Sequence, residues 1–304
     1  MRLVTIEDIR AAAERIEPAV LRTPLVPVGD VHVKPESLQR VGSFKLRGAY
    51  NAVASLRPAG VVTHSSGNHG QALAYAARSF GVPCVVVVPE GTPQVKTSAI
   101  EAHGAELVIV PRERRLSEAE KLAAERGLTM IPPYDHPAVI AGQGTIGLEI
   151  VADLPEVDVV VVPVSGGGLI SGVAAAVKAL RPEATVIGVE PELAADAAES
   201  LALGRPVVWE PARAFRTIAD GLRAHLSELT FAHLRAHVDG IVTVSEDEIR
   251  AAIRHLAVTG RLVAEPSGAA ATAACLSGRI PAGRTAVLLS GGNVDPALFR
   301  EVIS

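Results

Sequence analysis

Residues 157–169 read Val-Asp-Val-Val-Val-Val-Pro-Val-Ser-Gly-Gly-Gly-Leu, and an alanine-rich segment follows them as far as Leu180. The valine-rich run has the length and composition of a buried β-strand, and the alanine-rich segment has the composition of a helix. Consecutive glycines allow the chain to turn tightly between the two. The stretch therefore predicts a strand, a turn and a helix, the unit from which parallel sheets are built.

The same order of segments recurs from about residue 60 onward. Further apolar runs that predict strands lie at residues 61–64, 84–89, 106–110, 185–189, 241–244 and 285–289. These runs show no alternation of polar and apolar residues, as is typical of strands that are covered on both faces. We therefore predict an α/β fold with open, twisted parallel sheets.

The pair Pro132-Pro133 is a predicted domain boundary, because paired prolines continue neither a helix nor a central strand. A chain of 304 residues is long enough for two domains, since single cores stop growing at roughly 250–300 residues. We predict a large domain formed by residues 1–54 and 138–304, and a small inserted α/β domain formed by residues 55–137.

The composition indicates a small-molecule partner. A net charge of -4 and a pI near 6.2 give no attraction to nucleic acid or to an anionic membrane. Cys84 and Cys275 form no Cys-x-x-Cys pair, so neither a disulfide framework nor a structural zinc site is predicted. Residues 5–8 resemble a helix start and not a signal peptide, and no apolar run reaches the ~20 residues of a membrane span. We expect a cytoplasmic protein.

Three predicted strands end in polar, glycine-rich turns. These are Ser65 to Gly70, Ser165 to Leu169 and Ser290 to Asn293. Ligands bind at the carboxyl ends of parallel strands in open α/β folds. The turn at residues 165–169 also opens a predicted helix, whose first amides and dipole favour an anion such as a phosphate. The three turns together predict one binding site.

Two other interpretations of residues 165–169 stay open at this point. The turn is compatible with a tight connection that binds nothing. It also resembles the fingerprint of a nicotinamide-dinucleotide site, because Gly166 and Gly168 are followed by Glu190 at the end of the next strand. The third glycine of that fingerprint is Ser171 here, so one glycine-rich turn does not decide the cofactor.

Lys45 is the candidate nucleophile. Small residues surround it, since Gly42, Ser43, Gly48 and Ala49 are its near neighbours in the chain. Close packing would remove water from the amine, and a desolvated lysine has a lowered pKa and becomes a nucleophile and a base. Such a lysine suits a carbonyl cofactor that carries a phosphate.

Five motifs occur in one order along the chain. They are Gly-Ser-Phe-Lys-Leu-Arg-Gly-Ala (42–49), Ser-Ser-Gly-Asn-His-Gly-Gln-Ala (65–72), Ala-Gly-Gln-Gly-Thr (141–145), Ser-Gly-Gly-Gly-Leu (165–169) and Ser-Gly-Gly-Asn (290–293). With these motifs the chain resembles the fold type II pyridoxal-phosphate enzymes, in particular the group of serine/threonine dehydratases and serine racemases. The resemblance runs from about Thr23 to Asp295 and overrides the nicotinamide interpretation.

The resemblance implies a role for each matching residue. Lys45 would hold pyridoxal phosphate as a Schiff base, Phe44 would lie beside the pyridine ring, Asn68 would bond the ring hydroxyl, and Ser290 would meet the pyridine nitrogen. The phosphate would be held by Ser165, Gly166, Gly167, Gly168 and Leu169. The substrate carboxylate would be received by Ser65, Ser66, Gly67, Asn68 and His69.

The implied activity is a dehydratase, or ammonia-lyase. A serine hydroxyl does not keep the pyridine nitrogen protonated, so the cofactor is a weaker electron sink and prompt loss of a β-leaving group is favoured. L-Serine, L-threonine or a related β-hydroxy amino acid would give a 2-keto acid and ammonia. A 3-hydroxyaspartate dehydratase is an alternative. Ser66 keeps a serine racemase, or a bifunctional enzyme, open as well, because the matching serine of the racemases faces the cofactor opposite the lysine.

The resemblance also implies a metal site and a homodimer. In related racemases and dehydratases a glutamate, a backbone carbonyl and an aspartate bind Mg²⁺ or Ca²⁺, and the matching residues are Glu190, Ala194 and Asp196. Carboxylates and carbonyls suit such hard cations. The homodimer is an expectation from the resemblance alone.

Overall fold

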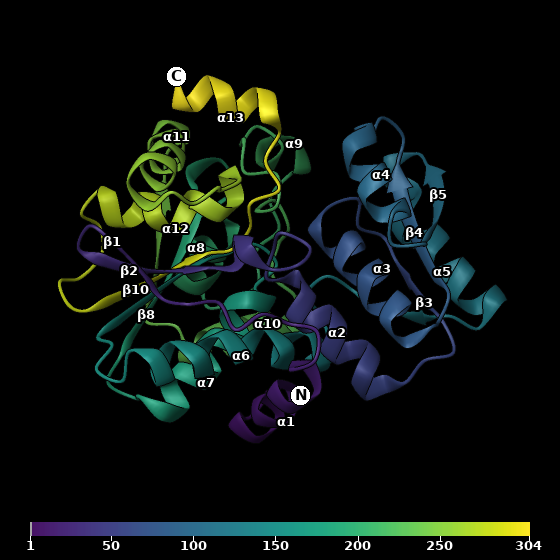
Figure 1. Ribbon diagram of the computed structural model, residues 1–304, viewed down its shortest axis with the longest axis horizontal. Helices are drawn as coiled ribbons and strands as arrows, with labels where there is room; N and C mark the ends of the chain where they lie inside the picture. The colour runs from purple at the N-terminus through teal and green to yellow at the C-terminus, as the bar shows by residue number, and fades with distance from the viewer. Residues whose placement is uncertain (1) are drawn as a thin grey trace.

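The computed structural model describes residues 2–304, which form two sheets (Figure 1). The larger sheet has six strands in the order β1-β2-β10-β7-β8-β9, and the smaller has four in the order β5-β4-β3-β6. Every pair of neighbouring strands is parallel except β1 and β2. The predicted α/β class with open parallel sheets is therefore confirmed.

The strands of the larger sheet are β1 (Val26–Val28), β2 (Val31–Pro35), β7 (Val159–Pro163), β8 (Thr185–Pro191), β9 (Gly240–Val244) and β10 (Thr285–Leu289). Those of the smaller sheet are β3 (Val61–Thr63), β4 (Cys84–Pro89), β5 (Glu106–Val110) and β6 (Thr129–Met130). The helices are α1 (Ile6–Ile16), α2 (Lys45–Leu56), α3 (Asn68–Phe80), α4 (Gln94–Glu101), α5 (Arg115–Arg126), α6 (Pro137–Asp153), α7 (Gly168–Leu180), α8 (Asp196–Leu203), α9 (Pro211–Ala214), α10 (Glu228–His237), α11 (Glu246–His255), α12 (Pro266–Leu276) and α13 (Pro296–Ile303).

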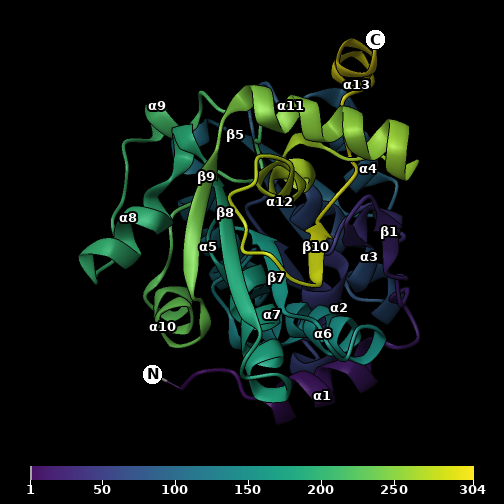
Figure 2. The same cartoon turned by 90° about the vertical axis from the view of Figure 1, so that its left-hand side faces the viewer.

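Helices cover both faces of the larger sheet, as Figure 2 shows. Alternate residues of the central strands belong to two different cores. In β7, Val159 and Val161 pack with α11 and α12, whereas Val160 and Val162 pack with α6, α7 and α10. Two-sided burial explains why these strands read as unbroken apolar runs.

The strand predictions were right in place and approximate at the ends. The run predicted from Val157 begins two residues later as a strand, and the short strands β1, β2 and β6 were not predicted. The edge strand β5 differs from the expectation of complete cover, because Glu106 and Ile109 are exposed. An edge strand has a neighbour on one side only, so its side chains are less covered.

The smaller sheet lies wholly between residues 61 and 130. One of its faces packs on α5, and the other packs on α3 together with residues of α2. Helix α2 thus shares a core with the smaller sheet although most of the helix precedes residue 55. The division into residues 1–54 with 138–304 and residues 55–137 stays a proposal.

A buried ion network fixes the start of α2. The Arg47 guanidinium is fully buried and contacts both carboxylate oxygens of Glu36, at 2.8 Å each, and those of Glu149, at 2.6 and 2.9 Å. Lys34 is also buried and completes the charge balance with Glu149 at 2.6 Å. A side chain at Gly142 of α6 would lie 2.5 Å from the Arg47 carbonyl, so the two helices cross closely here. The network ties α2 to β2 and α6, two residues after Lys45.

No helix in residues 2–304 is long and apolar enough to cross a membrane.

Candidate active site

Lys45 is the first residue of α2, and the turn before it is attached to the end of β10. The Phe44 amide donates to the Ser290 carbonyl at 3.0 Å, and Ser43 forms an isolated β-bridge with Gly291. The motif around Lys45 and the motif that starts at Ser290 are therefore direct neighbours, although 245 residues separate them in the chain.

The Lys45 amine is held in a partly buried position. Its Nζ donates to the Pro133 carbonyl at 2.7 Å and lies 4.9 Å from the centre of the Phe44 ring. Burial lowers the pKa of Lys45 from 10.5 to about 8, because water no longer solvates the ammonium form. The predicted desolvation of this lysine is thus present, and roughly one quarter of the amine is neutral at pH 7.5.

The glycine-rich turn at residues 165–169 joins β7 to α7. Gly167 has a φ of +84°, a conformation that favours glycine, and it caps the helix. Within residues 2–304, no group accepts a hydrogen bond from the amides at residues 166–169. Four unpaired amides at a helix N-terminus form a ready site for a phosphate.

Tyr134 links this turn to Lys45. A side chain at Gly166 would lie 2.4 Å from the Tyr134 ring, and one at Gly168 would lie 2.7 Å from the Tyr134 Cβ atom. Tyr134 therefore packs flat against the turn, and the preceding residue, Pro133, accepts the hydrogen bond from Lys45. The amine and the glycine-rich turn with its unpaired amides are therefore both neighbours of the dipeptide Pro133-Tyr134.

The turn at residues 65–69 joins β3 to α3. Ser65 and Ser66 are partly exposed. A side chain at Gly67 would meet no other atom within 4 Å, so the space next to the Gly67 Cα atom is open. His69 is buried and its Nε2 donates to the Ile131 carbonyl at 2.9 Å, while burial, reinforced by the Lys45 charge, lowers its pKa to about 3. The His69 ring is therefore neutral, and its Nε2 holds the turn to Ile131, while its Nδ1 is buried without a hydrogen-bond partner within residues 2–304.

Asn68 and Ser290 approach the site from the two sheets. Asn68 begins α3, and its Oδ1 accepts a hydrogen bond of 2.8 Å from Asn293 in the last motif. Ser290 follows β10 and is buried, and its Oγ donates a long hydrogen bond of 3.5 Å to the Ser267 carbonyl. The structure thus brings the motifs at residues 42–49, 65–72, 165–169 and 290–293 together around Lys45.

The residues present fit pyridoxal phosphate. The site offers a partly neutral amine, a helix N-terminus with unpaired amides, and a carboxamide and a hydroxyl for the ring. The specific roles of Phe44, Asn68, Ser290 and the five residues of the phosphate turn stay proposals.

The candidate metal ligands lie near the end of β8 and in the segment that leads from it into α8. Glu190 lies one residue before the end of β8, and its carboxylate accepts hydrogen bonds from the amides of Ala197, at 3.1 Å, and Ala198, at 2.8 Å. Burial raises the pKa of Glu190 well above its usual range, with a further contribution from Asp196, and burial raises the pKa of Asp196 to about 6. Asp196 Oδ2 is buried without a hydrogen-bond partner. No cluster of three or more His, Cys, Asp or Glu side chains placed for a metal occurs within residues 2–304.

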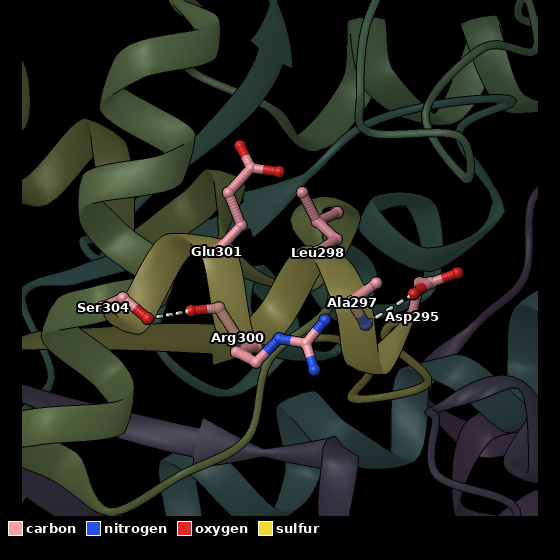
Figure 3. Close-up of a pocket in the computed structure, with 6 residues that line it drawn as sticks. All are labelled: Asp295, Ala297, Leu298, Arg300, Glu301 and Ser304. Carbon is pink, nitrogen blue, oxygen red and sulfur yellow. Dashed lines mark hydrogen bonds between the residues drawn. The ribbon is translucent and has the colours of Figure 1, made fainter.

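A surface pocket lies elsewhere, along α13 (Figure 3). Its residues are Asp295, Ala297, Leu298, Arg300, Glu301 and Ser304. The Ala297 amide donates to Asp295 Oδ1 at 2.7 Å, and Ser304 Oγ donates to the Arg300 carbonyl at 2.7 Å. These bonds cap the two ends of the helix, and none of the residues belongs to the site around Lys45.

Comparison with known proteins decides the family. The family described as "Pyridoxal-phosphate dependent enzyme" matches residues 16–291. The chain belongs to this family. Within it, the fold and the sequence place this pyridoxal-phosphate enzyme in fold type II, in the threonine dehydratase and serine racemase group, which confirms the predicted resemblance.

Relatives with three different activities are about equally similar to this pyridoxal-phosphate enzyme. The L-threonine ammonia-lyase of Thermotoga maritima is 40% identical over 99% of this chain and 79% of its own length. The L-threo-3-hydroxyaspartate ammonia-lyase of Saccharomyces cerevisiae is 39% identical over 100% of this chain and 98% of its own. The structure of maize serine racemase superposes with a TM-score of 0.94 at 36% identity, over 99% of this chain and 97% of that chain.

Two residues of the site were not predicted from the sequence. Tyr134 reaches the site only because the chain returns from β6 to α6 at this place. Glu265 precedes α12, and its carboxylate accepts a 2.6 Å hydrogen bond from Asn68. The only sequence signal for Glu265 is an acidic residue before a proline at a helix start, which is common in proteins that bind nothing there.

Proposed function

We propose that this protein is a hydroxy-amino-acid ammonia-lyase. The observation that carries the proposal is the Lys45 amine, which is partly neutral near pH 8 and lies beside a strand end that presents the Ser290 hydroxyl instead of a carboxylate. A hydroxyl partner leaves the pyridine nitrogen unprotonated, and this favours β-elimination over reactions that need a long-lived carbanion. The substrates are L-serine, L-threonine or a related β-hydroxy amino acid.

Each part of the site has a task in this reaction. The amides at residues 166–169 hold the cofactor phosphate, and those at the start of α3, from Ser65 to His69, receive the substrate carboxylate. Bound pyridoxal phosphate supplies an electron sink for the electron pair that remains when Cα loses its proton. The Lys45 amine removes that proton and then returns it to the departing β-hydroxyl, which leaves as water. The enamine that is released tautomerises to an imine, and the imine adds water and breaks down to a 2-keto acid and ammonia.

A serine racemase is the second candidate, and Ser66 is the observation that favours it. Its side chain is partly exposed and has no hydrogen-bond partner within residues 2–304. It lies on a different element from Lys45, so the two groups are suited to serve different sides of one substrate carbon. The similarity to serine racemases supports this candidate, and the yeast relative supports 3-hydroxyaspartate as a substrate.

We also propose a Mg²⁺ or Ca²⁺ ion at Glu190, the Ala194 carbonyl and Asp196. Two buried carboxylates with raised pKa values lie close together, and a divalent cation would neutralise them. In addition, we propose that the protein is a cytoplasmic homodimer. Two free cysteines, of which Cys84 is buried, support that location.

One assay separates the candidate activities. The purified protein is incubated with L-serine, L-threonine and L-threo-3-hydroxyaspartate, and the 2-keto acid and the D-amino acid are measured in the same sample. An ammonia-lyase gives keto acid and ammonia in equal amounts from at least one substrate. A racemase gives D-serine, and Ser66→Ala abolishes that product while dehydration continues. Absence of keto acid from all three substrates would overturn the proposal.

A further inference from the structure

Glu265 is a buried carboxyl group that the proposed reaction does not use. It is 6% exposed and directly precedes α12. Its amide donates to the Gly291 carbonyl at 3.0 Å, and a side chain at Gly291 would lie 2.2 Å from Glu265 Oε1. The carboxyl group is therefore pressed against the turn that follows Ser290.

A chain of directed hydrogen bonds connects Glu265 to the start of the motif around Lys45. The Val41 carbonyl accepts from Asn293 Nδ2 at 2.9 Å, and the same nitrogen donates to Asn68 Oδ1 at 2.8 Å. Asn68 Nδ2 then donates to Glu265 Oε1 at 2.6 Å. Because a backbone carbonyl only accepts, it fixes the orientation of Asn293, and Asn293 fixes the orientation of Asn68.

The orientation of Asn68 matters for the cofactor. Its Nδ2 carries two hydrogens, and Glu265 takes one of them, so one N–H is left for another acceptor. A flipped carboxamide would place Asn68 Nδ2 against Asn293 Nδ2, where two donors face each other. Glu265 adds an acceptor at the other end, so the unflipped orientation is favoured from both sides.

We propose that Glu265 is a positioning residue, which holds Asn68 so that its second N–H points to the ring oxygen of the bound cofactor. This inference rests on the proposed function, because it assumes that Asn68 is the residue that meets that oxygen. Glu265 itself acts only through Asn68.

The charge of Glu265 changes close to neutral pH. Burial raises the pKa of Glu265 to about 8, with a smaller contribution from Asp220, while the Asn68 hydrogen bond and Lys96 of α4 oppose the rise. Asp220 and Lys96 form an ion pair with each other at 2.5 Å. Below pH 8 Glu265 is mostly a neutral acid, and above pH 8 it is a carboxylate that holds the Asn68 N–H more strongly.

A double-mutant cycle on cofactor binding tests the inference. The full chain is freed of cofactor, and the dissociation constant of pyridoxal phosphate is measured by absorbance for the wild type, Glu265→Leu, Asn68→Ala and the double variant. Glu265→Leu should weaken binding about tenfold, which is the effect of one lost hydrogen bond. The double variant should bind no more than about twofold more weakly than Asn68→Ala alone, because Glu265 has nothing left to position.

Glu265→Gln is the matched control, since it keeps an acceptor for Asn68 and does not titrate. It should bind the cofactor within about threefold of the wild type. The visible spectrum of the wild type should change between pH 7 and 9, and the spectrum of Glu265→Gln should lose that change. This comparison also decides the matter if Glu265→Leu fails to fold, as judged by circular dichroism.

Two results would overturn the inference: losses of affinity that add in the double variant, or an unchanged pH dependence in Glu265→Gln. Failure of the proposed function looks different, because the wild type would then bind pyridoxal phosphate but release no 2-keto acid from L-serine, L-threonine or L-threo-3-hydroxyaspartate. If the wild type binds it and Asn68→Ala weakens binding while the losses add, only the role of Glu265 is refuted.

Discussion

The lowered pKa of Lys45 predicts how fast the protein captures its cofactor at each pH. Only the neutral amine attacks an aldehyde, so protonation suppresses capture. At pH 7.5 a lysine with a pKa of about 8 is roughly one quarter neutral, whereas a lysine at the ordinary value of 10.5 is neutral in about one molecule of a thousand. Lys45 should therefore present roughly 200-fold more reactive amine than an exposed lysine.

The direction of the pH dependence follows from the same numbers. Below pH 8 the capture rate should rise about tenfold per pH unit, and above pH 8 it should level off. The capture rate of a lysine with the ordinary pKa of 10.5 would keep rising up to about pH 10.

Pulse labelling measures this difference within one molecule. Cofactor-free protein is mixed briefly with pyridoxal phosphate between pH 6 and pH 10, the adduct is fixed with borohydride, and the modified peptides are quantified by mass spectrometry. Lys121, an exposed lysine of α5, is the internal control. The reasoning would be refuted if Lys45 had a midpoint near pH 10, or if Lys45 and Lys121 were labelled with the same pH profile.

Three further perturbations have defined outcomes. Arg47→Met leaves Glu36 buried without its partner, so the free energy of unfolding should fall by about 3–5 kcal/mol in urea titrations. The control Arg114→Met removes an exposed arginine and should cost less than about 0.5 kcal/mol. Equal losses in the two variants would contradict the stabilising role of the buried ion network. Gly168→Ala places a side chain 2.7 Å from Tyr134 and should weaken pyridoxal-phosphate binding about tenfold or more in spectrophotometric titrations. Unchanged affinity would contradict the proposal that the turn at residues 165–169 holds the phosphate. Removal of divalent cations by a chelator should lower Tm by about 2–4 °C and added Mg²⁺ should restore it, whereas a constant Tm and activity would refute the metal proposal.

Much of the fold was predictable because its signals are local. With the exception of β6, the strands from β3 onward lie in mainly apolar runs, and the capping box at Ser245 and Glu248 gives the start of α11 directly. The strands β1, β2 and β6 were not predictable, because residues such as Pro27, Lys34 and Thr129 interrupt their apolar pattern. Their pairing depends on β10 and β3, which are distant in the chain.

The site was predictable where one residue type is required by the backbone. Gly167 must adopt a positive φ, and Lys45 lies in a segment of small residues that lets α2 pack closely on α6. The sequence therefore indicates where an anion and an amine lie, but not which other groups meet them. The Pro133 carbonyl, Tyr134 and Glu265 reach the site through tertiary packing alone, so only the folded chain reveals them.

The central claim is that Lys45 carries out cofactor-dependent deamination of a β-hydroxy amino acid. The most direct measurement compares wild type and Lys45→Ala, after both are incubated with pyridoxal phosphate, for visible absorption and for 2-keto acid release from L-serine, L-threonine and L-threo-3-hydroxyaspartate. The wild type should show the absorption band of a protonated Schiff base and release keto acid, and Lys45→Ala should lose the band and at least about 1,000-fold of the rate. A colourless wild type, or a Lys45→Ala variant with unaltered activity, would contradict the claim.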